Sequence, residues 1–213
     1  MNEGRRARPP LRFNWLAPSA ILLVLLYPTV WLHELGHAAA AYGLGCKSDP
    51  FSTGMELGLF GSTGGEIDYT CLAEKGSNAY AVVGVAGIVV NIVAAWVAYV
   101  VSRQARRPGW KSGWLLFCLA NALEAFSYLT GSTLFPRSDM LEVLPVIPVP
   151  PVLIAAVATA LGLPLIVTLH RSIAKKSNTH QSLSLVALSL TSATIVVCMV
   201  WARLSYVLIA QAG

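Results

Sequence analysis

The segment WLHELGHAAA, residues 31–40, holds the side chains of this chain that are best arranged for chemistry. On a helix, residues four apart lie on one face, so His33 and His37 can direct both imidazoles at one metal ion. Glu34 lies beside them and can approach a water on that ion. The spacing HExxH is typical of zinc hydrolases, with two histidine ligands and a glutamate as general base. The sequence therefore predicts one Zn²⁺ ion and a zinc-bound water that Glu34 activates.

The surroundings of this motif are unusual for ionisable groups. Residues 14–42 form an apolar run long enough to cross a bilayer, which takes roughly 20 residues. Ionisable side chains are costly in hydrocarbon, and where they occur there they commonly serve a function. Two histidines and a glutamate are hard to place in such a helix as packing residues, so we favour the metal site.

The composition predicts the elements that must position the motif. Of 213 residues, 55% are hydrophobic and only 12% are charged, which excludes an ordinary soluble domain. We expect a single all-α integral membrane domain, residues 1–213, with about five transmembrane helices. The apolar runs that predict them are residues 14–42, 80–101, 113–134, 152–169 and 183–209.

The charges predict how these helices are oriented. Arginine and lysine gather in the tail 1–13 and in the linkers 103–111 and 171–176, on one side of the predicted bundle. The loop 43–77 is instead mostly acidic. Because cytoplasmic loops are enriched in Lys and Arg, we expect a cytoplasmic N-terminus and an external loop. The net charge of +5 thus predicts topology and no nucleic-acid partner.

The loop 43–77 has features of its own. FSTGMELGLF and GEIDYTC flank the turn-like GSTGG, and their alternation predicts a short β-hairpin or sheet over Phe51–Cys71. A glycine-rich loop without strands is the alternative. Such a hairpin could hold an extended substrate by strand addition. If the loop is extracytoplasmic, Cys46 and Cys71 can form a disulfide that closes it.

HELGHA within an apolar helix resembles the site-2 protease family of intramembrane zinc metalloproteases. The resemblance implies a third zinc ligand, an Asp on a later helix within an LDG-like motif. FPRSDM is the match here and makes Asp139 the candidate, although the neighbouring Leu and Gly are missing and an SD pair resembles a small branch of the family. AGIVVNIVAAW resembles the family's glycine-rich helix and makes Asn91 its matching residue. Family members often place zinc nearer the cytoplasmic face, whereas the charges here place it nearer the outside.

Several polar residues in the apolar runs keep more than one interpretation. Glu124 is the rival to Asp139 as third ligand, or it orients a ligand histidine from behind, or it only packs helices together. Asn91 either donates to an oxyanion or to substrate backbone, or it joins two membrane helices. His170 and His180 lie beside basic residues and are expected at the surface.

The function that the sequence favours is an intramembrane zinc endopeptidase, acting on membrane-spanning or membrane-proximal protein substrates within the bilayer. A non-catalytic metal-binding adaptor or regulator is the main alternative, and the intact Glu34 argues against it. A metal transporter should show further intramembrane polar clusters or repeats. A membrane zinc hydrolase of a lipid or a non-peptide amide would carry the same motif.

Overall fold

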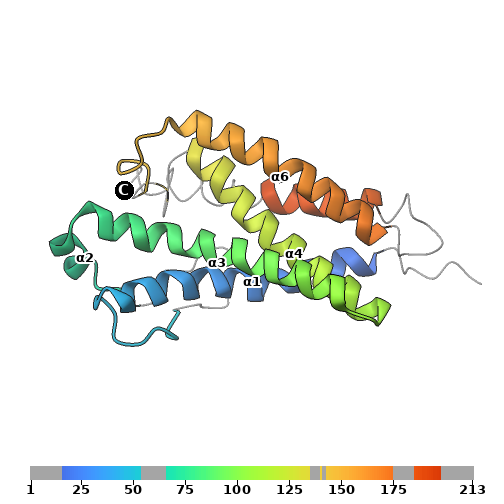
Figure 1. Ribbon diagram of the computed structural model, residues 1–213, viewed down its shortest axis with the longest axis horizontal. Coiled ribbons are helices and arrows are strands. Elements are labelled where there is room, and N and C mark those ends of the chain that lie inside the picture. The colour runs from blue at the N-terminus through green and yellow to red at the C-terminus, as the bar shows by residue number, and fades with distance from the viewer. Residues whose placement is uncertain (1–15, 54–65, 135–139, 141–142, 175–184, 198–213) are drawn as a thin grey trace, which may run out of the picture.

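The structure is a computed structural model that describes residues 16–53, 66–134, 140, 143–174 and 185–197 (Figure 1). Three of the predicted apolar runs form helices that are long and apolar enough to cross a membrane. These helices are α1 (Ala17–Gly43), α3 (Ser77–Gln104) and α6 (Pro151–Ala174). The prediction of a helical membrane protein is therefore confirmed in its main features.

The other two predicted spans are helical, but the helices described there are not both long and apolar enough to count as membrane spans. α4 (Pro108–Ser127) begins before the predicted run and continues into a π-helical turn, η1 (Tyr128–Ser132). It carries Asn121 and Glu124 and is less apolar than α1, α3 and α6. The described part of the last helix, Leu185–Val197, is shorter than a membrane span. A total of five transmembrane helices stays a prediction.

The β-hairpin predicted over Phe51–Cys71 is not seen. The prediction of a second strand that ends at Cys71 is wrong, because Tyr69–Lys75 form a short helix, α2. Asp68 explains the difference: its side chain accepts the Cys71 N–H at 2.9 Å, the N-cap that opens a helix. The described residues contain no strand, and residues 54–65 lie outside them.

A disulfide closes the chain where α1 meets α2. α1 ends at Gly43, and just beyond it Gly45, with a φ of +75°, turns the chain so that Cys46 N–H donates to the Ala41 carbonyl at 2.9 Å. The predicted Cys46–Cys71 disulfide is present, with the two Cα atoms 5.5 Å apart. We call residues 44–53 and 66–76, which this disulfide joins, the cap.

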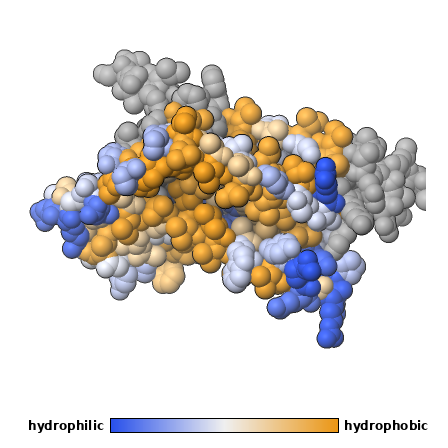
Figure 2. All heavy atoms as spheres, turned by 45° about the horizontal axis from the view of Figure 1, so that its top comes forward, coloured by the Kyte–Doolittle hydropathy of each residue, from blue (hydrophilic) through white to orange (hydrophobic). Residues whose placement is uncertain are grey.

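Helices α1, α3 and α4 all pack against one another. A short linker, residues 105–107, turns the chain back so that α4 packs along α3, and α1 packs against both (Figure 1). Large apolar side chains nevertheless face outward along the helices, among them Val24, Trp96 and Leu161. Figure 2 shows this apolar surface across the middle of the molecule, with hydrophilic residues towards its ends. Such a surface suits lipid contact and would be a liability in water.

Candidate metal centre

The three residues of the HExxH motif come together on the inner face of α1. His33 is fully buried, and Glu34 and His37 are each 5% exposed. The two imidazole rings meet edge to face with centroids 4.6 Å apart. Among the described residues, the ligand atoms of these three side chains lie within 4.8 Å of one another. The helix geometry therefore brings the motif together, and its role in binding zinc stays a prediction.

Gly87 on α3 leaves the space that both histidines face. A Cβ at this position would lie 2.7 Å from Nε2 of His33 and 2.7 Å from Nε2 of His37. The two nitrogens that would coordinate a metal thus point into the same small volume beside the Gly87 backbone. Gly36 makes this approach possible, because a Cβ there would lie 2.7 Å from the Ala86 carbonyl oxygen. α1 and α3 are therefore in backbone contact at the motif.

The backbone of α3 sets the protonation of His37. Nδ1 of His37 lies 2.7 Å from the Val83 carbonyl oxygen, in a buried hydrogen bond. A carbonyl only accepts, so Nδ1 must carry the proton and donate. The lone pair of the neutral ring is then on Nε2, the atom that faces Gly87. A hydrogen bond of this kind fixes the tautomer and ring orientation of a metal-binding histidine.

Asn91, about two turns beyond Val83 on α3, is the polar neighbour of His33. Nδ2 of the fully buried Asn91 lies 3.4 Å from Nδ1 of His33. Oδ1 of Asn91 has no hydrogen-bond partner in the described part of the chain. The two ends of an amide have nearly the same shape, and their assignment follows the hydrogen-bond network. With the amide turned, Oδ1 would accept from Nδ1–H, and His33 would then have the same tautomer as His37.

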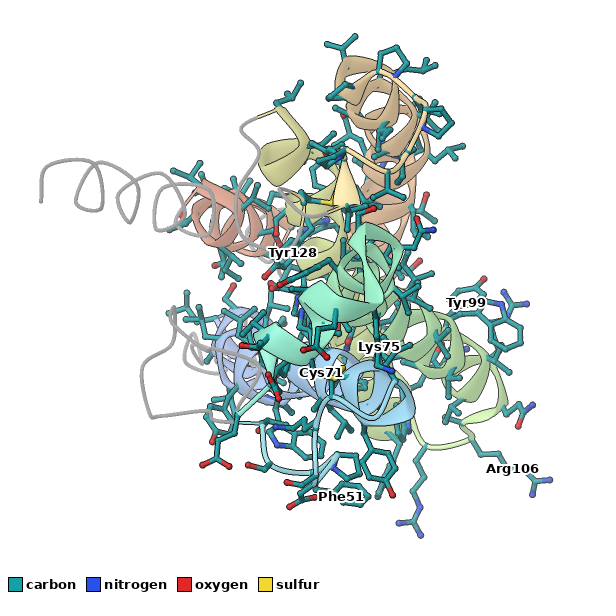
Figure 3. The ribbon with its side chains drawn as sticks, turned by 90° about the vertical axis from the view of Figure 1, so that its left-hand side faces the viewer. Phe51, Cys71, Lys75, Tyr99, Arg106 and Tyr128 are labelled. Carbon is teal, nitrogen blue, oxygen red and sulfur yellow. A yellow bond between two sulfur atoms is a disulfide. The ribbon has the colours of Figure 1, made fainter. Side chains whose placement is uncertain are left out.

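Tyr128 covers the other side of His33. The two rings are stacked, with centroids 4.4 Å apart and planes 15° from parallel. Tyr128 opens η1, and the Thr133 hydroxyl donates to its carbonyl at 3.2 Å. Single π-helical turns often occur at functional sites, because they redirect a side chain within a helix. Figure 3 shows Tyr128 among the helices, and its ring covers one face of the His33 ring.

The candidates for the third ligand differ in what the structure says of them. Glu124 is buried on α4, one turn before Tyr128, but it does not join the group formed by the motif residues. Asp139 lies outside the described residues. Its neighbour Met140 is buried in the same apolar cluster as Tyr128 and Ile88. The assignment of the third zinc ligand to Asp139, with Glu124 as the alternative, stays a prediction.

The expectation that His170 lies at the surface is wrong. Two residues that contribute to the site, Gly87 and Tyr128, were given no role by the sequence. His170 was expected at the surface but is 4% exposed, with Nε2 2.8 Å from the Ser192 hydroxyl. The interface between α6 and the last helix buries it; His180 lies outside the described residues. The sequence offered only weak signals for Gly87, within the glycine-rich stretch, and for Tyr128, on the helix face of Glu124.

One of three comparisons with known proteins finds a match. The model of one family, described as peptidase family M50, matches residues 21–205, which include most of α1 and all of α3, α4 and α6. No curated protein and no solved structure matches the chain.

Proposed function

The chain belongs to peptidase family M50, the site-2 proteases, and on this premise we propose that it is an intramembrane zinc endopeptidase. Membership of this family implies zinc-dependent peptide hydrolysis, because the family consists of zinc-dependent proteases embedded in membranes. The observation that supports its activity in this chain is the convergence of both Nε2 atoms on one point beside Gly87, with Glu34 in the same group.

The donor set fits a catalytic zinc ion. Zinc binds neutral imidazole nitrogen, and the Val83 carbonyl holds His37 in the tautomer that presents Nε2. Gly87 provides the room that any other residue would fill. A catalytic zinc site takes three protein ligands and leaves one position for water or substrate. Two histidines and one carboxylate from another helix would complete that set with a single ion.

We assign the third ligand to Asp139 and keep Glu124 as the alternative. Met140 supports Asp139, because it follows Asp139 in the sequence and belongs to one buried cluster with Tyr128, whose ring stacks on His33. Zinc content of purified Asp139→Ala and Glu124→Ala variants tests the assignment. Loss of zinc in the Asp139 variant alone is expected, and loss in the Glu124 variant alone would reverse it.

The residues of the motif divide the chemistry between them. His33, His37 and the third ligand would hold a zinc ion, which would supply a Lewis acid for the scissile carbonyl and lower the pKa of a nearby water towards neutral. Glu34 takes a proton from the attacking water and passes it to the leaving amine as the peptide C–N bond breaks. Asn91 holds His33 in place; it is also our candidate for a hydrogen bond to the oxyanion or to substrate backbone.

The location of the site suggests the kind of substrate. His33 and His37 lie within α1, a candidate membrane span, so the scissile bond must enter the bilayer or its edge. A peptide bond in an intact helix is shielded and hydrogen-bonded, so a substrate span must unwind locally before it is cut. We therefore propose membrane-spanning or membrane-proximal protein segments as substrates.

A Glu34→Gln variant gives the main test of this function. The amide keeps the size of the side chain but cannot take up the proton, so zinc should remain while cleavage of single-span membrane peptides is lost. Metal analysis of the purified variant is the control for folding and zinc binding. If Glu34→Gln cleaves as fast as the unaltered protein, the peptidase mechanism is wrong.

A further inference from the structure

The disulfide of the cap indicates on which side of the membrane the cap lies. The Cys46–Cys71 disulfide ties the end of α1 to α2, and the Cys46 carbonyl also accepts the Asp68 N–H at 2.9 Å. Structural disulfides persist in oxidising compartments and are rare in the reducing cytoplasm. The end of the bundle that carries the cap is therefore expected to face away from the cytoplasm.

The charges at the two ends of the bundle point independently to the same orientation. The exposed acidic residues of the described chain lie in the cap, and most exposed basic residues lie at the opposite ends of α3, α4 and α6 (Figure 1). The exposed acidic residues are Asp49, Glu66, Asp68 and Glu74, and the exposed basic ones at the far end are Arg103, Arg106, Arg107 and Arg171, with the partly buried Lys111 beside them. Lys75 is the exposed basic exception in the cap. Lys and Arg mark the cytoplasmic side of membrane proteins.

The motif lies much nearer to the cap than to the basic end. Leu35, at its centre, is eight residues from Gly43, or about 12 Å at about 1.5 Å per residue. It is eighteen residues from Ala17, or about 27 Å. Across a hydrocarbon layer about 30 Å thick, the site thus falls in the part nearest the cap.

The cap is also packed directly onto the groups that orient the site. Cys46, Ile67 and Leu72 of the cap form one buried cluster with Ala41 of α1 and Val83 of α3. The Val83 carbonyl is the group that accepts from Nδ1 of His37. Within the part of the chain that the structure describes, the disulfide-bonded cap therefore packs directly on the turn of α3 that orients His37.

We propose that water and substrate reach this site from the extracytoplasmic side, and that the protein cuts membrane-spanning substrates in the outer third of the span. This rests on the proposed peptidase function. An approach from the cap crosses less than half the depth that an approach from the basic end would cross. The substrate segment should accordingly unwind close to its extracytoplasmic end, and the larger part of its span should remain on the cytoplasmic product.

Labelling of the full chain in intact cells tests the orientation without any need for activity. A membrane-impermeant phosphine followed by a sulfonated maleimide should label Cys46 and Cys71, and label neither without the phosphine. A Gln104→Cys variant, at the basic end of α3, should be labelled only after permeabilisation. Peptide mass spectrometry identifies the labelled positions. Free thiols at Cys46 and Cys71 in intact cells, or labelling only after permeabilisation, would overturn the proposal.

Cleavage of two matched substrates tests the depth. The substrates are single-span proteins that differ only in whether one helix-breaking proline lies in the outer or the inner third of the span. We expect the outer variant to be cut at least about tenfold faster, with the cut within that third. Faster cleavage of the inner variant would overturn the proposal and leave the peptidase function intact. If neither is cut, the peptidase function fails, and the labelling alone decides the orientation.

Discussion

Replacing Gly87 by alanine should remove zinc while leaving the fold in place. The added Cβ would lie 2.7 Å from Nε2 of both His33 and His37, where ordinary contacts begin near 3.4 Å. Each ring would have to retreat by about 0.7 Å, which is more than the roughly 0.2 Å that a metal site tolerates. Changing groups that merely orient ligands costs about 10–100-fold in metal affinity, so we expect at least about a 100-fold loss here.

The cost to the fold should be smaller than the cost to the metal site. The atoms that meet the new methyl group are the tips of two side chains, and these can rotate away. Overpacking of this kind destabilises a protein by about 1–3 kcal/mol. Zinc competition against a chelator measures the affinity, and thermal unfolding followed by circular dichroism measures the stability.

Two other glycines provide the controls for this prediction. Gly36→Ala would place a methyl group 2.7 Å from the Ala86 carbonyl oxygen, which is backbone and cannot rotate away. This variant should lose stability along with zinc. Gly113→Ala meets no atom within 4 Å and should change neither. If Gly87→Ala binds zinc as tightly as the unaltered protein, the metal does not lie between the two Nε2 atoms, and our account of the site is incorrect.

Three further perturbations probe the groups around the site. Asn91→Leu removes the polar partner of His33 and should weaken zinc binding by about 10–100-fold in the same competition assay, whereas Asn91→Asp, which keeps an acceptor, should weaken it less. Tyr128→Phe should keep zinc affinity because the stacked ring remains, and Tyr128→Ala should lower it by about 2–10-fold; equal affinities would exclude the stacking as a contribution. A Cys46→Ser, Cys71→Ser double variant should be less stable by about 3 kcal/mol in thermal unfolding, and an unchanged melting curve would show that the disulfide does not stabilise the cap.

Local patterns predicted the parts of this protein that depend on neighbours in the chain. The spacing of His33 and His37 predicted a shared helix face, because both positions belong to one helix. The apolar runs predicted α1, α3 and α6 because burying a helix in lipid needs continuous apolar length. The disulfide was predicted because Cys46 and Cys71 lie at the two ends of one short loop.

The wrong expectations arose where a contact outside the pattern decided the outcome. The alternation at GEIDYTC is compatible with a strand, but the Asp68 side chain caps a helix there. His170 lies beside basic residues, but the last helix covers it and Ser192 meets its ring. In the first case a capping hydrogen bond, and in the second the packing of another helix, decides the structure against what alternation or composition favours.

The sequence alone determined that this chain is helical, apolar enough for a membrane, and equipped with two histidines and a glutamate on one helical face. The tertiary structure decided which ring nitrogens face the metal position and how much room they have. His37 is oriented by a carbonyl 46 positions away and His33 by an amide 58 positions away. These contacts depend on how closely α1 approaches α3 at Gly36 and Gly87. The packing of two helices sets that distance, and no spacing within either helix encodes it.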